Sequence, residues 1–277
     1  MNSPGRRVRK SMAALAAASL VLGLSSCGDD GGEAKGITLV NEGYLTVCTH
    51  LPYKPFQFTD DGGEVVGFDV DLLQLLADDL GVDMEVVDIG WNQITSGAAF
   101  SAQKCDVGMG AMTILPERDK ALEISDPYFD ATQSLLVQAD SGYEDLSDLE
   151  GEELGVQTDT TGQVYAEEHA EEHGYTPKVF EDSLTEFNAV KSGDIAAAIN
   201  DNGVLYDYAA DNTDTEVTAT FNTGEQYGFA ALEDDANADE LIDRLNDVLA
   251  EAKKSGEYDT IYKEWFGQLP EAAGDVK

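Results

Sequence analysis

Three histidines and three cysteines are among the residues in this sequence whose types suit metal binding or covalent chemistry. His169 and His173 lie four residues apart in a helix-like segment, a spacing that can hold a metal ion. Four glutamates surround them, at positions 167, 168, 171 and 172, which favours a solvated surface over a metal site. The sequence contains no GxSxG or HExxH motif and no glycine-rich phosphate loop, so no catalytic constellation is indicated. We therefore expect neither a metal nor a cofactor.

Cys48 and Cys105 are a second pair of residues that could react with each other. Cys48 lies in the strand-like run 45–49, and Cys105 begins another such run, 105–109. If the two strands are neighbours, a disulfide is geometrically feasible, and an exported protein permits it. Two free buried thiols are the alternative. The even number of cysteines beyond Cys27 favours the disulfide.

Strand-like and helix-like segments alternate along most of the chain. Apolar residues recur at spacings of three and four over residues 69–80, which predicts a helix that Gly81 ends. The pattern predicts further helices at 161–173, 184–192, 203–210, 241–253 and 258–266, and a helix opening at 116–118. It predicts strands at 45–49, 84–87, 107–112, 133–137, 154–157, 195–199 and 227–232. Such alternation indicates an α/β fold with parallel sheets covered by helices.

Residues 1–26 are typical of a secretory signal, because a basic start precedes the apolar run 12–24. This run is shorter than the roughly 20 apolar residues that span a bilayer. Two serines before Cys27 resemble a lipobox, so we expect Cys27 to become the acylated first residue and to anchor the protein. An ordinary signal peptide with an incidental cysteine is the alternative. Residues 27–36 then read as the lipidated cysteine and a flexible spacer.

The charge of the chain is strongly negative. The net charge is −39 over 277 residues, and it becomes −43 when residues 1–26, with four basic and no acidic side chains, are removed. This balance argues against nucleic acid as a partner, since phosphate binding needs basic patches. A solvated acidic surface explains it. The length fits one large or two medium domains outside the membrane, attached by the anchor alone.

Residues 67–80 begin with GFDVDLL and resemble the signature of the extracellular solute-binding proteins of family 3, the amino-acid receptors of ABC importers. Further segments agree with the family in order, at residues 52–56, 106–118, 125–128, 155–161 and 262–267. The resemblance covers roughly residues 36–269.

The resemblance implies an α/β fold of the periplasmic-binding-protein type II, with two lobes that close like a hinge over ligand. Two strand-like crossings join the lobes. Lobe 1 is expected to take residues 37–131 and 225–269, and lobe 2 residues 132–224. Residues 270–277 form a C-terminal tail.

The resemblance also implies the site that holds the α-groups of an amino acid. Arg118 matches the family's carboxylate-binding arginine, whose planar guanidinium can make two parallel charge-assisted hydrogen bonds. The backbone N–H groups of Ala111 and Thr161 are expected to complete that clamp. Thr113 is expected to place its hydroxyl on the ligand's ammonium group. Asp201, at the end of a strand, matches the acidic partner of the ammonium, with a helix N-cap as the alternative role.

Four further residues are expected to surround the ligand side chain. Tyr53 and Trp91 match the family's two sandwiching aromatics, with core packing as the alternative. His50 and Gln157 occupy positions that help to set specificity in relatives. Because His50 is not an acid, we expect a polar amino acid, glutamine or glutamate before a basic one.

Three positions depart from the family pattern. Asp159 stands where glycine is common, Leu115 where a threonine often caps a helix, and Gly110 where a hydroxyl-bearing residue is common.

The function implied is capture of a free L-amino acid without chemistry. The partners are then a membrane permease with its cytoplasmic ATPase, and we expect a monomer. A dehydratase of the cyclohexadienyl type is an alternative, with His50 and Asp201 as the candidates for acid or base. A ligand sensor that feeds a membrane receptor is another.

Overall fold

A computed structural model describes residues 33–267 and residue 269. Its main sheet has nine strands: β3 (Tyr44–Thr49), β6 (Asp83–Asp88), β7 (Val107–Thr113), β8 (Leu122–Ile124), β9 (Phe129–Gln138), β10 (Glu153–Gln157), β11 (Thr176–Phe180), β12 (Ala197–Asp201) and β13 (Thr215–Leu232). The order across the sheet is β11-β10-β12-β9-β13-β7-β3-β6, and β8 pairs with β13. Two small ribbons pair β1 (Glu33–Ala34) with β2 (Ile37–Thr38) and β4 (Phe58–Thr59) with β5 (Val65–Val66).

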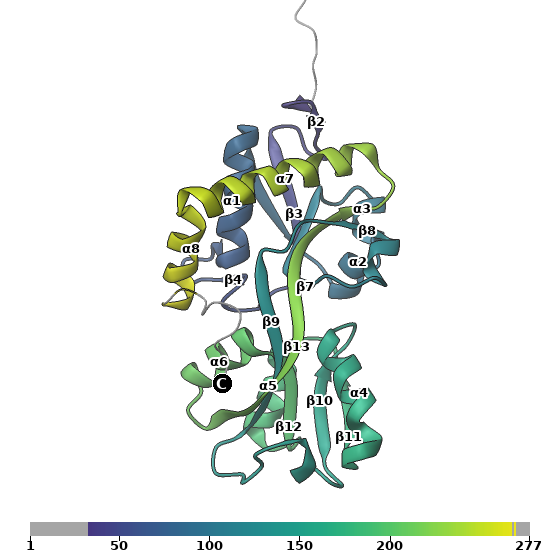
Figure 1. The fold of residues 1–277 in the computed structure, drawn as a ribbon, viewed down its shortest axis with the longest axis vertical. Helices are drawn as coiled ribbons and strands as arrows, with labels where there is room; N and C mark the ends of the chain where they lie inside the picture. The colour runs from purple at the N-terminus through teal and green to yellow at the C-terminus, as the bar shows by residue number, and fades with distance from the viewer. Residues whose placement is uncertain (1–32, 268, 270–277) are drawn as a thin grey trace, which may run out of the picture. The chain divides into compact units, whose positions relative to one another are not determined.

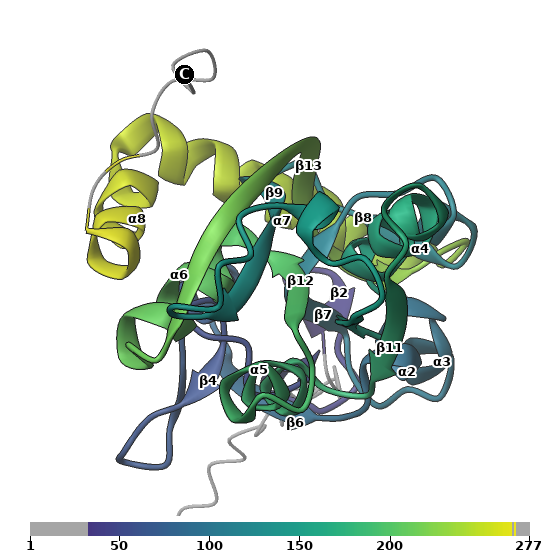
Figure 2. The same ribbon diagram turned by 90° about the horizontal axis from the view of Figure 1, so that it is seen from below.

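The long neighbouring strands β9 and β13 run through both halves of this sheet (Figure 1). We call the strands β3, β6, β7 and β8 with their helices the β3 half, and β10, β11 and β12 with theirs the β10 half. The β3 half carries α1 (Phe68–Leu80), α2 (Trp91–Thr95), α3 (Ala98–Ser101), α7 (Ala236–Ser255) and α8 (Glu257–Phe266). The β10 half carries α4 (Thr161–His173), α5 (Ser183–Ser192) and α6 (Asn202–Asp211), with α4 and α5 on opposite faces of β11 and β12 (Figure 2).

The predicted α/β alternation is confirmed, and the predicted parallel pairing is found among the outer strands but not at the two crossings. β10 runs parallel to β11 and β12, and β3 runs parallel to β6 and β7. β9 and β13 are antiparallel to each other and to their outer neighbours. The reason is that the chain passes from one half to the other along β9 and returns beside it along β13.

The pairing of the two crossings is interrupted at one place. Phe221 pairs with Gln133 and Glu225 pairs with Ala131, so the register shifts between these two pairs. Such an irregularity bends and twists a ribbon locally. The predicted lobe boundaries, at residues 131/132 and 224/225, fall in this interruption, and those boundaries stay a prediction.

Three local predictions need correction. The strand expected at 195–199 is Ala197–Asp201, so Asp201 closes the strand. The helix expected to open at 116–118 is a single 3₁₀ turn, Arg118–Lys120. The last strand begins at Thr215 rather than at residue 227. Its residues 216–226 are largely polar and at least partly exposed, so this part lacks the apolar run that marks residues 227–232 as a strand. A second 3₁₀ turn, Leu146–Asp148, and the elements β11, α2 and α3 were not predicted.

The structure contains the disulfide between Cys48 and Cys105, whose Cα atoms lie 5.6 Å apart. The parallel pairing of β3 with β7, which sets Cys48 opposite Gly108, brings the two cysteines together. The predicted signal segment, Cys27 and most of the spacer lie outside the described residues, as does the predicted tail at 270–277. Within the described part of the chain, no helix combines the length and apolarity needed to cross a membrane.

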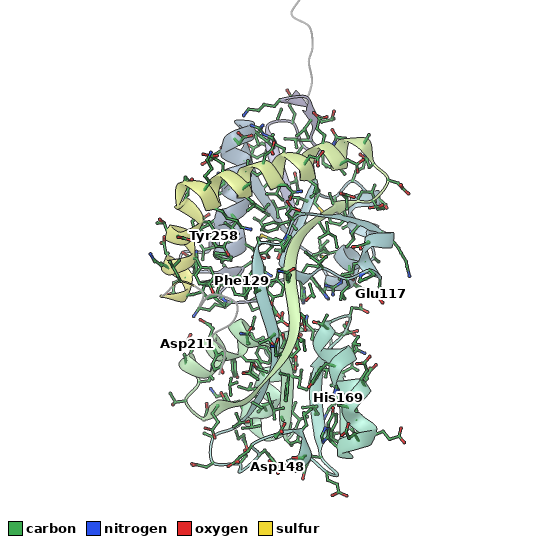
Figure 3. All side chains as sticks on the ribbon, viewed as in Figure 1. Glu117, Phe129, Asp148, His169, Asp211 and Tyr258 are labelled. Atoms are coloured by element: carbon green, nitrogen blue, oxygen red, sulfur yellow. A yellow bond between two sulfur atoms is a disulfide. The ribbon has the colours of Figure 1, made fainter. Side chains whose placement is uncertain are left out.

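Aromatic side chains tie the last helix to the ends of both crossings that lie in the β3 half. Phe129 stacks on Tyr227 with ring centroids 5.4 Å apart, and its ring lies 5.2 Å from that of Phe266 on α8. Phe129 and Tyr258 both lie in this region of the β3 half (Figure 3). Gly67, before α1, has a φ of 144°, and a Cβ there would overlap the carbonyl oxygen of Phe56. This close approach explains the glycine of the GFDVDLL segment.

Candidate functional site

A cavity lies between elements of the two halves. All nine residues predicted for the site line it: His50, Tyr53, Trp91, Ala111, Thr113, Arg118, Gln157, Thr161 and Asp201. Gln57, Gly110 and Thr160 line it as well and were not predicted as site residues. The structure therefore brings the predicted residues together, and their contact with a ligand stays a prediction.

Arg118 is only 8 % exposed, and its guanidinium is fixed by three contacts. Nη1 donates to the carbonyl oxygen of Thr113 at 2.8 Å and Nη2 to that of Asp159 at 3.1 Å, while the group lies 5.6 Å from the Trp91 ring centroid. Burial lowers the pKa of Arg118, and the charges of Asp201 and Glu225 oppose that shift. An arginine has five N–H donors, so donors remain for an anion in the cavity.

The departures at Asp159 and Gly110 have structural reasons. Asp159 has a φ of 59°, in the left-handed region that favours glycine and that aspartate tolerates better than most residues. Its carbonyl accepts hydrogen bonds from Trp91 Nε1, at 3.1 Å, and from Arg118. At Gly110, a Cβ would come within 2.6 Å of Trp91 Cζ3, so glycine makes room for the indole.

Asp201 is 7 % exposed and accepts hydrogen bonds on both carboxylate oxygens. Tyr53 and Tyr227 donate to Oδ2 at 2.7 and 2.6 Å, and Gln133 Nε2 donates to Oδ1 at 2.5 Å. Burial, followed by the charge of Glu225, raises the pKa of Asp201 to about 6. The side chain makes no capping hydrogen bond to α6, so the alternative N-cap role is not realised.

The predicted role of the Ala111 N–H is wrong. This group donates to Asp69 Oδ2 at 2.9 Å, so it cannot complete a clamp in the cavity. The buried Asp69 carboxylate needs donors, and Tyr128 supplies the other one at 2.8 Å. Ala111 adopts a positive φ of 49° and lines the cavity nonetheless.

Thr161 is the first residue of α4, and Thr160 is its N-cap. The first N–H groups of a helix lack partners within the helix, and the helix dipole makes this end attractive to anions. Since both threonines line the cavity, the N-terminus of α4 faces the space that Arg118 borders. This placement supports the expected role of the Thr161 N–H, which stays a prediction.

Two polar residues of the crossings were missed. Glu225 accepts hydrogen bonds from Thr113 Oγ1 at 2.9 Å and Thr161 Oγ1 at 2.8 Å, and Gln133 Nε2 lies 3.1 Å from its Oε1. Gln133 is fully buried in β9. Ser134 and the apolar residues 135–137 follow it in the same strand. A glutamine in a buried strand was the available signal, because a buried amide needs polar partners.

His50 and Gln57 contribute polar atoms with open hydrogen-bonding capacity. His50 Nδ1 lies 3.0 Å from the carbonyl oxygen of Ile89. His50 Nε2 and Gln57 Oε1 are buried and have no hydrogen-bond partner within the described residues. Gln157, 4 % exposed, borders the same cavity from β10. Polar groups of this kind fix the orientation of a small ligand.

His169 and His173 lie outside the cavity. His169 stacks on Tyr165 at 4.2 Å and on His173 at 6.3 Å, and His169 Nδ1 contacts the carbonyl oxygen of Tyr165. In Figure 3, His169 on α4 and Asp211 at the end of α6 lie on opposite sides of the β10 half. Among residues 33–267, no group of three His, Cys, Asp or Glu side chains could hold a metal ion. The histidine pair therefore belongs to a surface stack of rings.

The buried Asp69 predicts a pH dependence of stability. Burial raises its pKa from 3.8 to about 7, against the opposing effect of its hydrogen bonds. The folded protein then binds a proton that the unfolded chain releases near pH 4, so the free energy of unfolding falls as pH rises from about 4 to about 7. The free energy of unfolding, measured with urea, should decrease between pH 5 and pH 7.5 in the wild-type protein. This decrease should be smaller by at least about 1 kcal/mol in Asp69→Asn. An equal decrease in both proteins would contradict this assignment.

Comparison with known proteins gives one family. The sequence profile of the bacterial extracellular solute-binding proteins, family 3, matches residues 45–268. Among curated relatives, the arginine-binding extracellular protein ArtP of Bacillus subtilis is 29 % identical over 261 residues, which covers 94 % of this chain and 98 % of ArtP.

Solved structures agree with this result. An ancestral arginine-binding protein bound to arginine superimposes with a TM-score of 0.74 at 36 % identity, covering 81 % of this chain and 99 % of the other. The same kind of ancestral protein has also been solved bound to glutamine. The ancestral amino acid-binding protein AncCDT-1, a precursor of cyclohexadienyl dehydratase, gives a TM-score of 0.71 at 36 % identity, covering 81 % and 95 % of the two chains.

Proposed function

This chain belongs to the bacterial extracellular solute-binding proteins of family 3 and has their two-lobed α/β fold, and on that basis we propose that it captures a free amino acid and delivers it to the permease of an ABC importer. One observation carries the proposal: Arg118 and Asp201, buried and of opposite charge, border a single cavity. A zwitterion presents a carboxylate and an ammonium group together, so it matches both charges at once. An uncharged small molecule would offer neither of these two buried groups an opposite charge, which is costly.

The arrangement assigns a part of the ligand to each side of the cavity. Arg118 and the N-terminus of α4 suit the carboxylate, and Asp201 suits the ammonium group. Tyr53 and Trp91 supply apolar walls, and His50, with Gln57 and Gln157, supplies polar contacts for a side chain. We propose a polar L-amino acid on these grounds. Glutamine and arginine are the first two to test, since ancestral relatives were solved with each.

The test is calorimetric titration of the ligand-stripped protein with each common amino acid. At least one should bind with a Kd of about 1 μM or tighter, equivalent to about −8 kcal/mol. The methyl ester and the N-acetyl derivative of that amino acid are matched controls, because each removes one of the two charges. Both should bind far more weakly. Absence of binding by every amino acid would overturn the proposal.

The proposal includes attachment to the outer face of the membrane through lipid on Cys27, with residues 28–36 as a spacer, and a monomeric binding protein. Mass spectrometry of the membrane-extracted protein should then find acyl chains on Cys27. Capture without turnover is also part of it. An enzyme would convert the bound amino acid on incubation, and a sensor would bind it equally well but signal to a receptor rather than support uptake.

A further inference from the structure

Glu225 receives hydrogen bonds from both halves of the sheet. Thr113, which ends β7 in the β3 half, donates to Glu225 Oε2 at 2.9 Å. Thr161, which begins α4 in the β10 half, donates to the same oxygen at 2.8 Å. Glu225 itself lies on β13 at the interruption of register between the two crossings. A single carboxylate oxygen therefore joins the two halves next to the cavity that both threonines line.

These contacts fix what the two hydroxyls can do toward a ligand. A threonine hydroxyl has one proton to donate and two lone pairs to accept, whereas a carboxylate only accepts. Because both protons point to Glu225, each hydroxyl oxygen can only accept a hydrogen bond from a group in the cavity. The hydroxyls therefore suit the N–H donors of an ammonium group and do not suit a carboxylate.

Glu225 also changes the charge at that end of the cavity. Gln133 Nε2 lies between Asp201 Oδ1, at 2.5 Å, and the Glu225 carboxylate, at 3.1 and 3.2 Å, so its amide bridges two acids. The carboxylates of Asp201 and Glu225 then both act on Arg118, as does that of Asp159. The titratable groups that act on or contact Asp201 are Tyr53, Arg118, Tyr128, Glu186, Glu225 and Tyr227. Glu225 is the charged neighbour with the largest effect on the pKa of Asp201.

We infer that Glu225 is a positioning residue for the ligand's ammonium group, acting through the hydroxyls of Thr113 and Thr161 and through its charge. The inference rests on the proposed capture of an amino acid and adds a residue that lies outside the lining of the cavity. The second negative charge of the site is then the Glu225 carboxylate on β13, which contacts residues of both halves.

The test compares Glu225→Gln with Glu225→Asp, which keeps the charge, and with Glu216→Gln, which removes an exposed charge from the same strand. Each protein is titrated with L-arginine and L-glutamine between pH 5 and pH 8, and its folding is checked by thermal unfolding. Glu225→Gln should weaken binding about ten-fold or more. The pH below which affinity falls should also move lower, because Asp201 loses a negative neighbour. Glu225→Asp should keep the wild-type midpoint, and Glu216→Gln should match the wild type in both measurements.

Three results would separate the possibilities. Unchanged affinity and midpoint in Glu225→Gln would overturn the inference. Weaker binding with an unchanged midpoint would also overturn it, since a purely structural defect has that signature. If the wild-type protein binds neither probe, nor any other amino acid, the proposed function itself fails and this inference fails with it.

Discussion

Replacement of Asp201 by asparagine is expected to weaken amino-acid binding about 100-fold or more, measured by calorimetry at pH 7.5. Asparagine keeps the size of the side chain but removes the charge that an ammonium group would meet in a buried place. It also introduces an amide donor where Tyr53, Tyr227 and Gln133 all donate. Removing one partner of a buried, hydrogen-bonded charge pair is costly because the other charge stays desolvated.

The pH dependence of binding provides a second measurement on the same variant. Asp201 has a pKa of about 6 in the ligand-free protein and must be ionised to hold an ammonium group. Wild-type affinity should therefore fall as pH drops through about 6, and Asp201→Asn should lose this dependence. Asp214→Asn is the matched control, since it removes an exposed carboxylate and should bind normally. Wild-type affinity in Asp201→Asn would remove Asp201 from the site.

Replacement of Arg118 by alanine is expected to lower affinity by a similar factor, about 100-fold or more, because two charge-assisted hydrogen bonds to a carboxylate contribute about 1.5–3 kcal/mol each. The affinity of Arg118→Lys should lie between those of the wild type and Arg118→Ala. Lysine keeps the positive charge but lacks the planar fork that a carboxylate meets with two parallel bonds.

Folding must be separated from binding in this experiment, since Arg118 also holds the carbonyl groups of Thr113 and Asp159. Thermal unfolding of each variant checks the fold, and Arg118→Lys retains a cation if the alanine variant does not fold. Arg244→Ala is the matched control, because Arg244 pairs with Asp79 on α1, away from the cavity. Equal affinities for wild type and Arg118→Lys would show that the fork geometry is not used.

Residue types and their order were sufficient to predict nine of the twelve residues that line the cavity. Arg118 and Asp201 are a rare arginine and a strand-end aspartate, and each matches a residue of a known motif. The backbone donor at Ala111 could not be predicted in this way, because residue type does not reveal where an N–H group points. Only the tertiary structure shows that the buried Asp69 takes this group.

Glu225 and Gln133 illustrate a second limit. Glu225 is one of 55 acidic residues, so its type carries no signal in this chain. Its importance comes from the antiparallel pairing of β9 with β13, which places it beside Gln133 and between Thr113 and Thr161. A pattern of alternating strands and helices predicts elements but not the direction in which two distant strands pair.

The pairing of β9 with β13 has a consequence for the modularity of the chain. Gln138 pairs with Thr215, and the Ala139 N–H donates to the carbonyl oxygen of Asp214 at 2.9 Å, so the chain enters and leaves the β10 half at adjacent backbone positions. Residues 139–214 thus form an inserted cassette. Exchange of this cassette between relatives would replace Gln157, Thr161 and Asp201 in one step and leave Tyr53, Trp91 and Arg118 in place. The two walls of the cavity are therefore encoded by different stretches of the chain.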